Sequence, residues 1–121
     1  MPFRTTVRRL PNYVQWRVGG PTSLENFAQL VEEAAQQTRL RGDTRVMVDL
    51  REVEGQLKFT EQFAVGELVA DKLQHLVRVA SVVPPDQITR NSERVAQKKG
   101  LQLRVFASEA EAAEWLSSPA P

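Results

Sequence analysis

The chain has no cysteine among its 121 residues, and it has a single histidine, His75. Disulfide bonds, thiolate catalysis and sulfur-ligated metals are therefore excluded, and this composition fits a reducing compartment such as the cytoplasm. One histidine cannot form a histidine cluster, so we expect neither a metal nor another cofactor. No apolar run approaches the roughly 18 residues of a membrane span, and residues 1–10 lack the apolar core of a signal peptide. We therefore expect a cytoplasmic protein that does not span a membrane.

The chain has little net charge and few aromatic residues. Sixteen lysine and arginine residues face 15 aspartate and glutamate residues, and the basic residues are spread along the chain. Nucleic acids attract clustered positive charge, so this distribution argues against a nucleic-acid partner. Tyr13 and Trp16 are three residues apart and do not share one face of a strand, which leaves no stacking platform for bases. Trp16 and Trp115 are instead expected to anchor the core.

The residue combinations of common enzyme sites are missing as well. No Gly-x-Ser-x-Gly motif occurs, and His75 is expected to meet carbonyl groups at the end of its helix. Glu67 and Asp71 lie one helical turn apart, but without a histidine or third carboxylate nearby they are expected to form a solvated face. Asp49 ends a buried strand, as in phosphate-accepting receiver domains, yet residues 18–20 lack the acidic pair that would hold magnesium. Asp49 is expected to accept hydrogen bonds from backbone amides, and no enzymatic activity is predicted.

The first half of the chain has the pattern of a hairpin, a helix and a buried strand. Extended segments at residues 3–10 and 13–18 flank the turn-forming pair Pro11-Asn12, and residues 19–21 are expected to end the second strand. Helical spacing then begins at Thr22, which forms a capping-box pattern with Glu25.

That helix is expected to end near Gly42. Residues 45–50 form an almost continuous apolar run, which is typical of an interior parallel strand, and Gly55 marks the turn after it.

The next segments continue the alternation. Residues 60–76 predict a helix with more apolar surface than one buried stripe requires, so part of it is expected to meet a partner or a ligand. Residues 77–83 predict a strand ended by Pro84 and Pro85, since proline cannot donate to a sheet. Residues 86–99 are polar and predict a marginal, exposed helix.

The C-terminal segment is a strand that leads directly into a helix. Residues 103–106 are the strand, and Ser108 with Glu111 has the spacing of a capping box before a helix that carries Trp115. With no linker or repeat in the sequence, the alternation predicts one α/β domain over residues 1–121, a sheet with helices packed on it.

Three parts of this pattern resemble the SpoIIAA-like family, small bacterial proteins related in fold to STAS domains and described as STAS/SEC14-like. They are Val48-Asp49-Leu50-Arg51 with Gly55, the strand 79–83, and Arg104-Val105-Phe106 with Trp115-Leu116. The similarity runs from about Tyr13 to Leu116, although residues 84–86 lack the tryptophan that members often carry after the fourth strand. The resemblance implies a mixed, mostly parallel sheet of four or five strands flanked by helices, a cytoplasmic location, self-association and no enzymatic activity.

Anti-sigma-factor antagonists are better-studied relatives of this family and carry a phosphorylatable serine at the start of the helix after Asp49-Leu50. The hydroxyl residue at this place is Thr60, and residues 58–62 lack the expected Asp-Ser-Ser-Gly pattern. Thr60 is therefore expected to cap the helix, and it is the candidate modification site.

Two functions remain open. The preferred one is a non-enzymatic STAS-like interaction module, a homodimer or a binder of another protein, that uses the 60–76 helix as its contact surface. The alternative is a binder of a small lipophilic or anionic molecule in a pocket between that helix and the sheet. Candidate contact residues are Phe63, Leu68, Val69 and Leu73, and candidate polar groups for a ligand are Asp49, Arg51 and Arg78.

Overall fold

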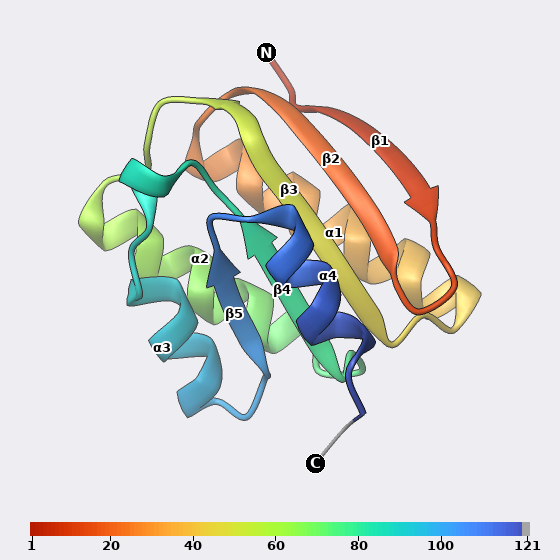
Figure 1. The fold of residues 1–121 in the computed structure, drawn as a ribbon. Coiled ribbons are helices and arrows are strands. Elements are labelled where there is room, and N and C mark those ends of the chain that lie inside the picture. The colour runs from red at the N-terminus through yellow and green to blue at the C-terminus, as the bar shows by residue number, and fades with distance from the viewer. Residues whose placement is uncertain (120–121) are drawn as a thin grey trace.

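The computed structural model describes residues 1–119, which form a five-stranded sheet with helices on both faces (Figure 1). The strands are β1 (Arg4–Arg9), β2 (Val14–Pro21), β3 (Arg45–Glu54), β4 (Arg78–Val82) and β5 (Leu103–Phe106). The helices are α1 (Leu24–Arg41), α2 (Phe59–Lys72), α3 (Asn91–Lys98) and α4 (Glu109–Ser117), with a 3-10 turn, η1 (Pro85–Gln87). Within residues 1–119, no helix is both long and apolar enough to cross a bilayer.

Strand order follows the chain, β1-β2-β3-β4-β5. The first pair is an antiparallel hairpin, and the three other pairs are parallel. The predicted mixed, mostly parallel sheet is therefore confirmed.

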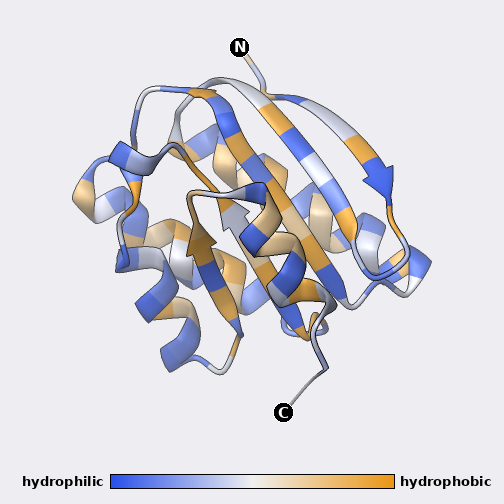
Figure 2. Cartoon of the chain, viewed as in Figure 1, coloured by the Kyte–Doolittle hydropathy of each residue, from blue (hydrophilic) through white to orange (hydrophobic). Residues whose placement is uncertain are grey.

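Two apolar layers hold the helices to the sheet. On one face, α1 and α2 pack on the strands, and α3 packs beside α2 and β5 (Figure 1). On the other face α4 packs alone over the last three strands. Apolar and polar residues alternate along the strands in Figure 2, because successive side chains of a strand point to opposite faces. This alternation decides which residues can share a site.

The expected break at residues 19–21 is wrong, because β2 continues to Pro21. Gly19 pairs with Glu52, and a Cβ at Gly19 would lie 3.2 Å from a guanidinium nitrogen of Arg4. The glycine here leaves room for a neighbouring side chain to cross the strand and does not end it.

Two predicted helix boundaries also differ. Ser23, and not Thr22, caps α1: its Oγ accepts a hydrogen bond from the backbone N of Asn26 at 3.0 Å. Helix α2 ends at Lys72, so the apolar residues Leu73 and Leu76 belong to the loop that follows, where both are buried. The predicted strand 103–106 and the Ser108 cap are confirmed.

Candidate functional site

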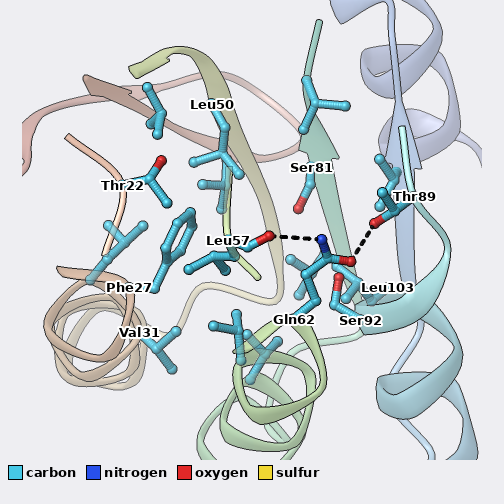
Figure 3. Close-up of a pocket in the computed structure, with 18 of the residues that line it drawn as sticks. Thr22, Phe27, Val31, Leu50, Leu57, Gln62, Ser81, Thr89, Ser92 and Leu103 are labelled. Carbon is cyan, nitrogen blue, oxygen red and sulfur yellow. Dashed lines mark hydrogen bonds between the residues drawn. The ribbon is translucent and has the colours of Figure 1, made fainter. Parts of the chain in front are cut away.

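An apolar cavity of about 170 Å³ lies between the sheet and helices α1 and α2 (Figure 3). Parallel strands form its floor, α1 and α2 form its walls, and the loops after the strands form its opening. The apolar lining includes Phe27, Leu30, Val31 and Ala34 of α1, Val65 and Val69 of α2, Leu73, and Trp16, Val48, Val79, Leu103 and Val105 of the strands.

One row of residues crosses the floor. Trp16 pairs with Val48, Val48 with Ser81, and Ser81 with Val105, so these four residues follow one another across β2, β3, β4 and β5. Paired residues of neighbouring strands project to the same face, and all four line the cavity. Ser81 carries the hydroxyl group of this row.

The opening is more polar than the floor. The Gln62 side chain donates from Nε2 to the carbonyl oxygen of Leu57 at 3.1 Å. Its Oε1 accepts hydrogen bonds from Thr89 at 3.1 Å and from Asn91 at 2.8 Å. Figure 3 shows Gln62 between the loop before α2 and the segment before α3. The opening lies beyond the carboxyl ends of parallel strands, where open α/β sheets place their ligand sites.

Trp16, on the floor of the cavity, carries an unpaired buried polar atom. Its side chain is 2% exposed, and its Nε1 has no hydrogen-bond partner within residues 1–119. Buried tryptophan N–H groups normally find an acceptor. The sequence interpretation of Trp16 as a core anchor is confirmed, but it missed this unpaired donor, which only the tertiary surroundings reveal.

Among residues 1–119, no lysine, arginine, histidine, aspartate or glutamate lines the cavity. A charged ligand group placed there would lose its hydration without gaining an ionic partner, which is strongly unfavourable. The cavity therefore suits a neutral molecule.

The structure separates the two groups of predicted site residues. Val69 and Leu73 line the cavity, and Leu68 is half-buried against the same core. Phe63 is half-buried, and its ring meets that of Phe59 edge-on with centroids 4.9 Å apart. Phe59 itself is 63% exposed.

Asp49, Arg51 and Arg78 do not converge on the cavity, contrary to the expectation. Val48 and Leu50 line it, so Asp49 between them points to the opposite face of the sheet. In β4 the cavity is lined by Val79 and Ser81, while Arg78 contacts α4 on the other side.

Asp49 and Arg51 belong to an ionic network between the sheet and the first turn of α4. The Asp49 carboxylate accepts two hydrogen bonds from the Arg51 guanidinium, at 2.9 and 2.7 Å, and one from the Arg51 backbone N at 3.1 Å. Arg51 also bonds to Glu109 at 2.6 Å, and Arg17 lies 3.6 Å from Asp49. Burial alone would raise the pKa of Asp49, but the hydrogen bonds from Arg51 and the charges of Arg51 and Arg17 bring it below its usual value. The expected backbone hydrogen bond to Asp49 is confirmed, and these contacts tie α4 to the sheet.

Arg78 binds the C-terminal end of α4. Its guanidinium donates to the carbonyl oxygens of Trp115, Ser118 and Pro119 and to the Ser118 hydroxyl. The last carbonyls of a helix have no partner within the helix, and a positive charge there also suits the helix dipole. Arg78 therefore acts as a C-terminal cap of α4.

Thr60 and His75 do not occupy the positions expected from the sequence. Thr60 does not occupy the N-cap, which is Lys58; it is exposed in the first turn of α2. The Glu61 carboxylate accepts a hydrogen bond from the Lys58 backbone N at 2.9 Å. His75 lies in the loop after α2 and contacts Thr38 of α1, so the expected position at the end of its helix is wrong.

The comparisons with known proteins agree on the fold. The family model described as SpoIIAA-like matches residues 13–117, and no curated protein matches the sequence. A crystal structure of an uncharacterised DUF3478-family protein with a SpoIIAA-like fold from Shewanella loihica is 16% identical, with a TM-score of 0.61 over 95% of this chain and 93% of that one.

Two further structures are similar. An anti-sigma factor antagonist from Mycobacterium paratuberculosis is 16% identical, with a TM-score of 0.60 over 96% of this chain and 95% of that one. The anti-sigma factor antagonist SpoIIAA in its unphosphorylated form is 15% identical, with a TM-score of 0.59 over 96% of this chain and all of that one. At these identities the structures share the fold, and the family model covers most of the chain. This chain therefore belongs to the SpoIIAA-like family.

Proposed function

We propose that this protein is a non-enzymatic regulatory module that binds a small, neutral, lipophilic molecule in the cavity between α1, α2 and the sheet. The cavity carries the proposal. Protein interiors are packed as tightly as organic crystals and contain few voids larger than a water molecule. An engineered apolar cavity of about 150 Å³ stays dry and binds benzene, and the cavity described here, about 170 Å³, has a comparable volume.

The lining favours the lipophilic over the anionic ligand, the two classes expected from the sequence. An anion would need a cation, but Arg51 and Arg78 contact α4 on the opposite face. We therefore keep the lipophilic ligand and drop the anionic one. The similarity to anti-sigma factor antagonists supports a regulatory role, and we expect the protein to act in the cytoplasm.

A titration with ethylbenzene tests this proposal. The protein contains two apolar layers, so methyl groups on the two faces of the sheet serve as site and control in one spectrum. The methyl resonances of Leu30, Val69 and Leu103 are expected to shift with added ethylbenzene until the site is saturated. The methyl resonances of Val82 and Leu116, which lie under α4, are expected to keep their chemical shifts. Equal shifts on both faces, or none on either, would contradict binding in the cavity.

The exposed aromatic pair favours a second function, binding of a protein partner or self-association as a homodimer. Phe59 is 63% exposed and stacks edge-on with Phe63 at the start of α2. The predicted contact surface thereby narrows to the first turns of α2. Leu73, by contrast, is 4% exposed, so a charge there would unfold the protein and could not test an interface.

Replacing Phe59 by glutamate leaves the core intact and tests this second function. If the surface is an interface, sedimentation velocity gives a smaller assembly for the F59E variant than for the wild type, while exposed Gln37 of α1 replaced by glutamate leaves assembly unchanged. The same sedimentation coefficient for wild type and F59E would exclude self-association through this aromatic pair. Modification of Thr60, which is exposed in the same turn, stays a prediction.

A further inference from the structure

We infer that the Ser81 hydroxyl is the polar anchor of the cavity, and that the cavity selects a neutral molecule of about one ring that carries a hydroxyl group. This inference rests on the proposed function, and it specifies the ligand class. Ser81 lies in β4, which pairs with β3 on one side and with β5 on the other. It is nonetheless only half-buried, while Ala80 and Val82 beside it are fully buried. The open space that reaches Ser81 is the cavity, which it lines.

The Ser81 hydroxyl faces the cavity. Ala80 and Val82 pack under α4, so Ser81 between them projects to the opposite face of the sheet, where the cavity lies. Figure 3 shows its oxygen directed away from β4, into the space between the strands and α2. The side chain therefore meets whatever occupies the cavity.

This hydroxyl has no partner within residues 1–119. Its neighbours in the row across the floor are Val48 and Val105, whose side chains have no polar group. The buried side-chain atoms without a partner in this part of the chain belong to Trp16 and His75, so the unpaired oxygen of Ser81 stays accessible. An accessible, unpaired hydroxyl on an apolar floor can bond to a ligand without first breaking a hydrogen bond within the protein.

The two ends of the cavity differ in polarity. Figure 3 shows Ser81, Gln62 and Ser92 toward α3, whereas Phe27 lies toward α1. Gln62 donates to the Leu57 carbonyl oxygen through Nε2, and its amide group carries a second N–H. A ligand with one polar end would place this end at Ser81 and its ring against Phe27.

The lining also limits the ligand in charge and size. Among residues 1–119 no ionisable side chain lines the cavity, so the polar end must be neutral. A serine hydroxyl both donates and accepts, and so does a ligand hydroxyl, so the hydrogen bond can form in either direction. The volume of about 170 Å³ accommodates one ring with a short substituent.

Benzyl alcohol and ethylbenzene form a suitable pair of probes, because the hydroxyl of one takes the place of the terminal methyl group of the other. Their dissociation constants are measured by methyl NMR titration for the wild type and for Ser81→Ala. Removing the alcohol from water costs the same in both proteins, so comparing the ratio of the two constants isolates the Ser81 hydrogen bond. Ser117→Ala is the matched control, because Ser117 is exposed at the end of α4 on the opposite face.

We expect the preference for benzyl alcohol over ethylbenzene to fall on the order of threefold to tenfold in S81A and to stay unchanged in S117A. In the wild type, nuclear Overhauser effects should join the methylene protons of benzyl alcohol to the β protons of Ser81. Its aromatic protons should show them to the ring of Phe27.

The outcomes separate the inference from the function beneath it. If both probes bind and the ratio is the same in S81A as in the wild type, Ser81 is not the anchor and the cavity still binds lipophiles. Binding of ethylbenzene without binding of benzyl alcohol would overturn the inference in the same way. If neither probe binds, the proposed function fails together with the inference. Should S81A not fold, the orientation of benzyl alcohol in the wild type decides, and a methylene group at Phe27 would contradict the anchor.

Discussion

The Nε2 atom of His75 lies 2.7 Å from the Oγ1 atom of Thr38, and this contact joins the loop after α2 to α1. Thr38 donates its only hydroxyl proton to the Ala34 carbonyl oxygen at 2.6 Å, so it accepts a hydrogen bond from His75. The proton of neutral His75 therefore resides on Nε2. Its Nδ1 is buried and has no partner within residues 1–119.

This arrangement predicts a loss of stability in mild acid. Burial, and then the charge of Arg39, lower the pKa of His75 below the ordinary value of 6.5. The unfolded chain consequently binds a proton that the folded chain does not, in the pH window from 6.5 down to the folded pKa, and stability falls as the pH falls through this window. Urea unfolding between pH 7.5 and 5.5 measures the effect. The slope should largely vanish in His75→Gln, and an unchanged slope in that variant would show that another group is responsible.

The lowered pKa of Asp49 predicts a second loss of stability, at a more acidic pH. Asp49→Asn is expected to lower the free energy of unfolding at pH 7 by about 1.5–3 kcal/mol, because hydrogen bonds to a charged, buried carboxylate are lost. The folded pKa of Asp49 is lowered, so its contribution is complete above about pH 4 and is lost as the pH falls through the folded pKa. The difference between wild type and D49N should shrink there.

Arg17→Gln is the matched control for Asp49, since the pair is 3.6 Å apart and Arg17 is half-exposed; its effect should stay below about 1 kcal/mol. A loss in R17Q as large as in D49N would contradict the assignment of Arg51 as the main partner.

Arg78→Leu should loosen α4 without closing the cavity. The variant leaves the carbonyl groups of Trp115, Ser118 and Pro119 without this donor, and we expect a loss of about 1–3 kcal/mol. Hydrogen exchange of α4 amides should accelerate more than that of α1 amides. Arg94→Leu, at an exposed position of α3, is the control. Unchanged exchange in α4 would argue against the capping role.

Ala34→Leu should fill part of the cavity. Ala34 is 5% exposed and lines the cavity, so the added methyl groups have space to contact Leu30 and Val69. We expect a gain of about 1 kcal/mol in the free energy of unfolding and loss of ethylbenzene binding. Gln37→Leu, exposed on the same helix, should change stability by less than about 0.5 kcal/mol and leave binding intact. A strongly destabilised A34L would mean that the space is already filled.

Local signals in the sequence predicted much of the fold. The strand 103–106 and its Ser108 cap are found as predicted, because short apolar runs and capping spacing act over a few residues. The end of α2 was missed because Leu73 and Leu76 extend the apolar spacing, although they are buried from a loop. Thr22 and Ser23 are adjacent hydroxyl residues, and sequence spacing alone could not choose the cap.

The site was only partly predictable. The helix that forms one wall was identified, and Val69 and Leu73 do line the cavity. The faces of Asp49 and Arg78 could have been deduced, since Asp49 alternates with Val48 and Leu50. The cavity itself has no sequence signal, because its volume depends on the separation of two helices from the sheet. The unpaired Nε1 of Trp16 is likewise a property of tertiary packing.

The most direct test of the cavity is a crystal structure of the protein under xenon pressure, because xenon occupies dry apolar cavities and scatters strongly. We predict a xenon site bounded by Phe27, Leu30 and Val69, above the row that runs from Trp16 to Val105. We also predict that this site is absent from A34L crystals. A space filled by side chains or by ordered water in the wild type, with no xenon there, would contradict the proposed ligand site.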